Sequence, residues 1–350
     1  MKIKVTFIML MLLATFMFAQ NKPYRVGTTA ANFLEMGIGS AANSMGEAYV
    51  SVAQDLSSIY WNPSGLGYLE SNEVIFMYQP WIADIKVSFA GAGIVLPQIG
   101  TLALSITNMD FGRTEVTTMQ MQEGTGETYS AGEYALGLSF GRKLADWFAF
   151  GTSVKWISSN IWHMSANALA LDLGVMVNTN FFSFSGKRED GMNIGMSISN
   201  YGTKMQYDGI DLLVPVDILP NENGNYKDIE GQYKVQGWEL PLIFRVGFSV
   251  KPIVTENQEL ILAVDALHPN NNSESLNIGA QYAMNFIGFG KFYLRGGFRG
   301  IYMDETEYGL TLGAGVHLTL LGNNNIKMDV AYKDMGIFNN TMTYSIGVTF

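Results

Sequence analysis

The chain has 350 residues and a net charge of −10, with 48% hydrophobic and 15% charged residues. The negative balance excludes nucleic acid as a partner, because no basic surface is available to neutralise phosphates. The absence of cysteine excludes a disulfide framework, and the 3 histidines lack metal-ligand spacing, so neither a metal nor a cofactor is predicted. Low charge together with 38 glycines and 13% aromatic residues favours strands that place one face in lipid.

Residues 1–19 have the features of a secretory signal peptide. A short basic start precedes an apolar run from Val5 to Phe18, and polar residues follow. The alternative is a membrane anchor, but the run is shorter than the roughly 20 residues that span a bilayer. We therefore expect export, with cleavage after Ala19.

Residues 20–72 lack the alternation of a strand and are predicted to form a separate segment. Part of it, residues 37–42, is glycine-rich and could suggest a dinucleotide fingerprint. That alternative is weak, because such a fingerprint follows a strand within a βαβ unit and no strand is predicted before residue 37.

From residue 73 onward, stretches of strand length follow one another with period-two alternation. In one of them Leu136 and Leu138 share a face, and Gly137 and Ser139 share the other. The bulky face is apolar throughout and the second face is small or polar. A soluble sandwich has the reverse pattern, with Lys and Glu on its outer face. About 14 such stretches of roughly ten residues predict an all-β fold, a transmembrane antiparallel β-barrel over residues 73–350.

The last stretch, Tyr344 to Phe350, alternates large apolar and small polar side chains up to the final residue. An outer-membrane barrel ends in this way because its last strand closes the sheet between lipid and lumen. We therefore expect residence in the cell outer membrane, with membrane lipid around the barrel.

The predicted connections alternate in length, as expected for short periplasmic turns and longer outer loops. Short ones are predicted near residues 97–100, 144–146, 286–290 and 321–325, and long polar ones at 112–130 and 203–239. The stretch 181–190 is an exception, since it is long for a periplasmic turn. A one-residue change of phase at Ala90-Gly91-Ala92-Gly93 predicts a β-bulge, which glycine permits.

Charged residues occupy the small-residue face of the predicted strands. A charge facing lipid near the midplane would cost about 2–4 kcal/mol, so this face is predicted to line the lumen. Two interpretations stay open: the charges pair with one another, or the basic ones dock an acidic inner segment or a ligand head group. The predicted lumen charges are Lys86, Lys155, Asp172, Arg245, Asp265, Arg295, Arg299, Glu307, Lys327 and Asp329.

Several motifs in and after residues 20–72 carry a family resemblance. They are Phe33-Leu34, Met45-Gly46-Glu47-Ala48, Asp55, Tyr60-Trp61-Asn62-Pro63-Ser64-Gly65-Leu66, and Trp81 with Asp84. In these the chain resembles the PorV/PorQ family of outer-membrane proteins, which is similar to the FadL-type transporters. The resemblance implies a 14-stranded barrel whose N-terminal segment, residues 20–72, folds into the lumen as a plug.

The residues of the segment suit such a plug. Asn62-Pro63 indicates a turn or the end of a helix, because Pro fixes φ and removes a donor. Gly65 would permit close approach of the backbone to the barrel wall, and Asp55 could cap a short helix through Ser57 and Ser58. The family-motif residues expected to hold the plug are Met45, Gly46, Glu47, Asp55, Trp61, Asn62, Pro63 and Gly65.

Two functions from different classes remain. The resemblance implies an accessory or shuttle component of type IX protein secretion, whose partners would be the translocon and its cargo proteins. The alternative is a FadL-like transporter of hydrophobic small molecules, whose partner would be a hydrophobic ligand. An apolar pocket of ligand size between plug and wall would favour transport, whereas a lumen closed by polar packing, together with an apolar outer-loop surface, would favour secretion. No nucleophile is grouped with a base, so an enzyme is not predicted.

Overall fold

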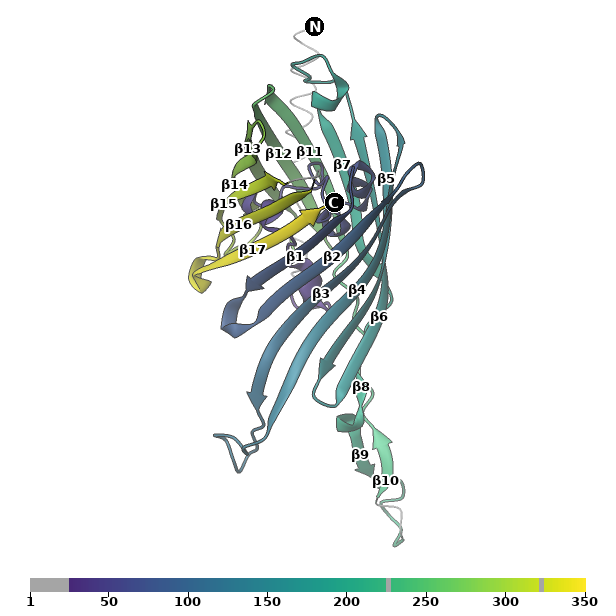
Figure 1. Ribbon diagram of the computed structural model, residues 1–350. Helices are drawn as coiled ribbons and strands as arrows, with labels where there is room; N and C mark the ends of the chain where they lie inside the picture. The colour runs from purple at the N-terminus through teal and green to yellow at the C-terminus, as the bar shows by residue number, and fades with distance from the viewer. Residues whose placement is uncertain (1–24, 225–227, 321–323) are drawn as a thin grey trace, which may run out of the picture.

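A computed structural model describes residues 25–224, 228–320 and 324–350 of the protein. The predicted signal peptide, residues 1–19, lies outside the described residues. The described chain forms one antiparallel barrel (Figure 1), whose 15-stranded sheet comprises fourteen long strands and the two-residue strand β8. The pairings β5–β6 and β1–β17 close the ring. The prediction of an all-β barrel of about 14 strands is therefore confirmed.

The barrel strands follow one another around the ring, and each is hydrogen-bonded to its neighbours. Their bounds are β1 Glu73–Pro80, β2 Lys86–Leu96, β3 Gly100–Glu115, β4 Thr128–Ala145, β5 Phe148–Ile161, β6 Met164–Asn178, β7 Asn193–Gly202, β11 Ile243–Val254, β12 Gln258–Pro269, β13 Ser275–Phe286, β14 Gly290–Ile301, β15 Leu310–Thr319, β16 Asn325–Asp334 and β17 Asn340–Thr349. Strand β8, Asp208–Gly209, pairs with β6, and β9, Leu213–Val216, forms a separate hairpin with β10, Ile229–Gln232. Short 3-10 helices lie in the connections: η4 Ile82–Asp84, η5 Arg188–Asp190, η6 Ile210–Leu212 and η8 Gly336–Phe338.

Side chains alternate between lipid and lumen along most strands as predicted. On β4 the Leu138 side chain is 49% exposed and the adjacent Ser139 is 1% exposed. Leu138 pairs with Leu104 on β3 and with Val154 on β5, and all three lie on the outer apolar face. This row of apolar side chains is what hydrocarbon requires of a strand surface.

The predicted bulge in residues 90–93 is wrong. Strand β2 keeps an unbroken register with β1 and β3 throughout. Val87 and Phe89 are buried on its inner face, whereas Lys86 lies on the outer face with Ile94, so the prediction that Lys86 lines the lumen is wrong. The inner face here packs against apolar side chains of the N-terminal segment, so large apolar residues on this face do not indicate lipid.

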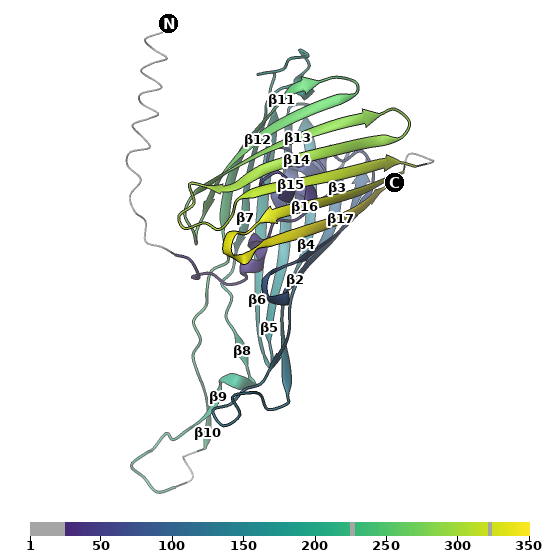
Figure 2. The same ribbon diagram turned by 90° about the vertical axis from the view of Figure 1, so that its left-hand side faces the viewer.

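The two ends of the barrel differ in the lengths of their connections. Turns 97–99, 146–147, 255–257 and 287–289 lie at the end where β1 starts and β17 stops, together with the longer turn 179–192. Connections 116–127 and 203–242 lie at the opposite end, and β8, β9 and β10 project from it (Figures 1 and 2). In an outer-membrane barrel the short turns face the periplasm, so the projecting end is the outer end.

The N-terminal segment lies inside the ring of strands (Figure 1). It contains η2 Asn32–Glu35, α2 Ser40–Ser44, α3 Ser58–Trp61 and η3 Pro63–Tyr68, which are joined by turns. Within the described residues, no helix has both the length and the apolar character needed to cross a membrane. Most side chains from Phe33 to Leu66 are buried, and they pack on inward-facing residues of the strands.

Candidate functional site

The segment is joined to the wall by a buried ion pair. Glu47 is 3% exposed, and its Oε1 lies 2.9 Å from Arg299 Nη1 on β14 and 3.6 Å from Lys333 Nζ on β16. Gly46 and Glu47 both adopt left-handed backbone conformations, with φ of 64° and 63°. A Cβ on Gly46 would come within 2.6 Å of the backbone of β13 and β14. Glycine therefore lets the turn reach the wall and present Glu47 to the two cations.

A wall carboxylate also holds the segment backbone. Asp265 on β12 is fully buried, and its Oδ2 accepts hydrogen bonds from Tyr49 N at 2.7 Å and Val50 N at 2.8 Å. Arg245 on the neighbouring β11 donates to Ser199 Oγ at 2.9 Å, and its guanidinium lies over the Tyr60 ring, 5.4 Å from the centroid. Because two backbone donors of the segment meet one buried carboxyl oxygen, Asp265 is a second fixed point.

The Asn62-Pro63 turn is bonded on both sides. Asn62 Nδ2 donates to Val50 O at 2.9 Å within the segment and to Val175 O at 3.0 Å on β6. Its Oδ1 accepts from Ser64 N and Ser64 Oγ, which makes Asn62 the N-cap of η3. The turn therefore ends α3, starts η3 and contacts the wall in one place.

The predicted role of Gly65 in approaching the wall is wrong. A Cβ on Gly65 would lie 2.1 Å from Ala53 O, which belongs to the segment itself. The wall makes the close approach with its own glycines: a Cβ on Gly174 would lie 2.1 Å from Asn62 Oδ1, and one on Gly151 would lie 2.2 Å from Pro63 C. Small residues on the inner face thus leave room for the segment.

The other motif residues lie within the segment. Met45 is fully buried beside Gly279 and Gly297 of the wall. Trp61 is 1% exposed and donates from Nε1 to Ile38 O at 2.7 Å. Asp55 accepts from the backbone N and the Oγ of Ser57, ahead of α3.

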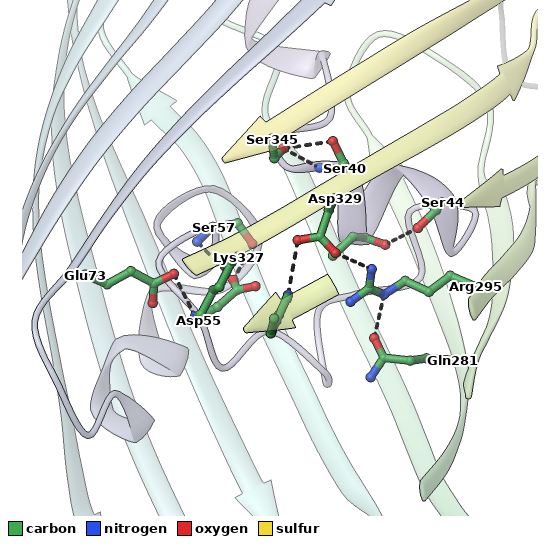
Figure 3. Close-up of polar contacts among 12 residues, drawn as sticks. Ser40, Ser44, Asp55, Ser57, Glu73, Gln281, Arg295, Lys327, Asp329 and Ser345 are labelled. Atoms are coloured by element: carbon green, nitrogen blue, oxygen red, sulfur yellow. Dashed lines mark hydrogen bonds and ion pairs between the residues drawn. The ribbon is translucent and has the colours of Figure 1, made fainter. Parts of the chain in front are cut away.

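Several predicted lumen charges pair with one another near the periplasmic end (Figure 3). Arg295 lies 2.6 Å from Asp329 and also donates to Gln281, and Lys327 lies 2.9 Å from Glu73. On the opposite wall, Lys155 Nζ lies 2.8 Å from Asp172 Oδ2. The charges therefore make two kinds of contact: some pair within the wall, and Arg299 pairs with the acidic Glu47 of the segment.

The prediction that Glu307 lines the lumen is wrong. Glu307 precedes β15, which starts only at Leu310, and its side chain is exposed in the outer loop. Its Oε2 accepts a hydrogen bond from Ile337 N of the neighbouring outer loop. The alternation begins at residue 308, before β15 starts at Leu310. Extending it to Glu307 therefore predicts a lumen position for a residue that lies in the loop.

Two cavities adjoin the segment. The larger, about 600 Å³, opens at the periplasmic end and is lined by polar and charged side chains that include Asp55, Lys251, Arg295 and Lys327. The smaller, about 30 Å³, lies among Phe33, Leu34, Ile59 and Phe89 and reaches the Lys155–Asp172 pair. Sites for small organic ligands usually measure about 300–1,000 Å³ and are mostly apolar, and neither cavity meets both conditions.

Burial changes the acidity of groups on the segment. It raises the pKa of the Glu35 carboxyl, although the hydrogen bond from Asn271 and the charges of Arg299 and Arg245 lower it. Burial also raises the pKa of Tyr68, to about 12. Over the described ranges, no group of three His, Asp or Glu side chains is placed to hold a metal ion.

Some contact residues were not predicted from the sequence. Lys333 shares the inward face of β16 with Lys327 and Asp329, so the alternation of that strand could have identified it. Asn271 bonds Thr29 and Glu35 from an outer loop, and no local pattern indicates this.

The outer loop 203–242 carries a group of exposed apolar side chains outside the barrel wall. Its β9–β10 hairpin projects away from the strands (Figure 2) and is held by pairs such as Val216 with Ile229. The exposed apolar side chains of this loop include Ile210 (62%), Leu213, Val216, Ile218, Leu219, Ile229 and Tyr233 (65%).

The sequence matches the family model described as type IX secretion system protein PorV over residues 18–218. No curated protein matches the chain. Solved structures with a similar fold include the CymD monoaromatic hydrocarbon channel, at TM-score 0.55 and 9% identity, with 89% of this chain and 97% of that chain covered. They also include the Ralstonia pickettii toluene transporter TbuX, at 0.54 and 10%, covering 89% and 98%. A Pseudomonas aeruginosa FadL homologue matches at 0.50 and 9%, covering 93% and 99%. At these identities the likeness concerns the fold.

Proposed function

The chain belongs to the PorV family of type IX secretion system proteins, and from this premise we propose that it is a non-enzymatic accessory or shuttle component of type IX secretion. It resides in the outer membrane as a FadL-like barrel. In this role it would bind the translocon, and cargo proteins in turn, through its outer loops.

The observation that carries the proposal is the apolar β9–β10 hairpin on loop 203–242. An isolated two-stranded hairpin is marginally stable in water, and exposed apolar side chains gathered in one place usually mark an interaction surface. Ile210 and Tyr233 are both more than half exposed, and both lie at the base of the hairpin, Ile210 before β9 and Tyr233 after β10. A partner that buried them would stabilise the hairpin and gain apolar contact area.

The interior of the barrel supports the same proposal. The N-terminal segment occupies the lumen, and the apolar cavity beside Phe33 and Phe89 has only about 30 Å³. A hydrocarbon passing through would need that space to grow severalfold. The alternative function is FadL-like transport of a hydrophobic small molecule. It is supported by this apolar lining and by structural similarity to a monoaromatic hydrocarbon channel and a toluene transporter.

A pull-down from detergent-solubilised outer membranes tests the proposal. We expect a large translocon barrel to copurify with the wild-type protein. Ile210→Asp with Tyr233→Asp should weaken that recovery, because central apolar contacts in interfaces are each worth about 2 kcal/mol or more, roughly 30-fold in affinity. Met119→Asp is the matched control, since Met119 is 93% exposed on the other long outer loop.

Two results would contradict the secretion role. One is the absence of any translocon barrel from the wild-type pull-down. The other is undiminished recovery with the double variant, combined with toluene uptake into proteoliposomes by the wild type, which would favour the transporter.

A further inference from the structure

The start of the described chain lies at the outer end of the barrel. Thr29 forms a parallel bridge with Glu239, and Ala30 N donates to Glu239 O at 2.9 Å. Glu239 lies between the β9–β10 hairpin and the start of β11, at the foot of loop 203–242. In Figure 2 the purple start of the described chain lies at the end of the barrel from which β8, β9 and β10 project.

A second outer loop holds the same stretch. Asn271 lies between β12 and β13 and is 5% exposed. Its Nδ2 lies 2.9 Å from both Thr29 Oγ1 and Glu35 Oε1, and it donates to these two acceptors. Loop 203–242 and the β12–β13 loop therefore both hold residues 29–35 at the outer mouth.

The other end of the segment is fixed at the periplasmic end. Asn72 N donates to Phe350 O at 3.1 Å, and Phe350 N donates to Asn72 O at 3.0 Å, next to the first residue of β1. Between these points the buried segment passes α2, α3 and η3. It therefore crosses the barrel from the outer mouth to the periplasmic mouth.

We infer that residues 25–35 form a strap that closes the outer mouth, with its first residues displayed at the cell surface beside the foot of loop 203–242. Val26 is 57% exposed, whereas Phe33 and Leu34 are buried, so the chain passes from solvent into the lumen within a few residues. The strap becomes part of the outer surface that a partner of loop 203–242 would meet. The inference depends on the contacts at the two mouths and on the direction of the barrel, and not on the secretion role.

Because the chain has 0 cysteines, single cysteine variants can be labelled specifically with a membrane-impermeant maleimide. Val26→Cys reports the strap, Met119→Cys reports an outer loop, and Ile287→Cys reports a periplasmic turn where the side chain is 86% exposed. We expect intact cells to label Val26→Cys as fast as Met119→Cys. Ile287→Cys should label only after the outer membrane is permeabilised.

Two labelling patterns would overturn the inference. Val26→Cys that labels only after permeabilisation would place the strap at the periplasmic mouth. Ile287→Cys that labels in intact cells while Met119→Cys does not would reverse the barrel. A heat-modifiable shift on gels identifies the variants that fold, and only these are compared.

A cross-link tests the attachment directly. Thr29 and Glu239 are bridge partners, and adjacent strands lie about 4.8 Å apart, within the range of Cα separations that a disulfide spans. Oxidation of Thr29→Cys with Glu239→Cys should therefore give an internal disulfide in the folded barrel. Thr28→Cys with Glu239→Cys is the control, because adjacent residues of an extended chain point to opposite faces. Equal cross-linking of the two pairs, or none in either, would show that the strap is not held at Glu239.

Discussion

Glu47 of the N-terminal segment and Arg299 of β14 face one another inside the barrel, with Oε1 and Nη1 2.9 Å apart. Lys333 of β16 approaches the same carboxylate at 3.6 Å. Both cations are fixed on the wall, so Glu47 can contact the two together only when its turn lies at one position along the lumen. The pair therefore sets where the segment sits along the lumen, in addition to any stabilisation it supplies.

Glu47→Gln should loosen the segment strongly. Removing one partner of a buried ion pair leaves the other charge uncompensated, at a cost of about 3–5 kcal/mol. We expect faster protease cleavage within residues 25–72 in detergent and a lower midpoint of urea unfolding. Glu189→Gln, at an exposed acid of a periplasmic turn, should change neither. Equal protease resistance of Glu47→Gln and wild type would show that the pair does not hold the segment.

Gly174→Ala should displace the Asn62-Pro63 turn from the wall. The added Cβ would lie 2.1 Å from Asn62 Oδ1, a distance that real Cβ contacts do not show, so the turn must move. We expect higher ion conductance in planar bilayers, because the segment would fill the lumen less completely. Gly132→Ala is the control, since its Cβ would meet only Met109 O at 3.5 Å. Unchanged conductance in a folded Gly174→Ala barrel would argue against the predicted plug.

The sequence predicts the barrel well because one rule applies to every strand that crosses the bilayer: apolar side chains face lipid, and small or polar side chains face the lumen. Leu138 and Ser139 follow that rule, and so does β17, which ends at Thr349. The rule fails at β2, where Val87 and Phe89 face apolar side chains of the segment and not water. Alternation identifies two faces, but it cannot say what covers the inner one.

The site was less predictable because its contacts join distant parts of the chain. The resemblance singled out Glu47 and the alternation placed Arg299 on the inner face, yet nothing local indicates that the two residues meet. The sequence predicts that Gly65 makes the close contact with the wall, but Gly151 and Gly174 of the wall make that contact. A glycine in the sequence indicates that another group approaches its backbone closely, but it does not show which residue that group belongs to.

Leu138→Arg should block assembly of the barrel. Leu138 lies on the lipid face in a row with Leu104 and Val154, and an arginine near the midplane costs about 2–4 kcal/mol. Leu138→Phe places a large apolar side chain at the same position and should assemble normally. The fraction of heat-modifiable protein in outer membranes measures both. Normal assembly of Leu138→Arg would mean that this face does not meet hydrocarbon.

The outer strap should be held more tightly at acidic pH. Burial raises the pKa of Glu35 above its ordinary value of 4.5, so the docked strap favours the protonated carboxyl. The groups that oppose this are the Asn271 amide and the guanidinium groups of Arg299 and Arg245. Between the ordinary pKa of the released carboxyl and the raised pKa of the docked carboxyl, the docked strap therefore binds more protons than the released strap. The stabilisation is complete below the pKa of the released carboxyl and is lost as pH rises through the raised pKa.

Hydrogen exchange of the Leu34 and Met36 amides measures this effect, because they donate to Ala31 O and Phe33 O within the strap. Their protection, taken relative to the intrinsic exchange rate at each pH, should fall as pH rises above the ordinary carboxyl value of 4.5. Each unit of raised pKa corresponds to about 1.4 kcal/mol, or roughly tenfold in protection. Glu35→Gln keeps an acceptor for Asn271 but cannot ionise, so its protection should not vary with pH. If protection in the wild type rises with pH, or if Glu35→Gln shows the same fall, Glu35 does not control the strap.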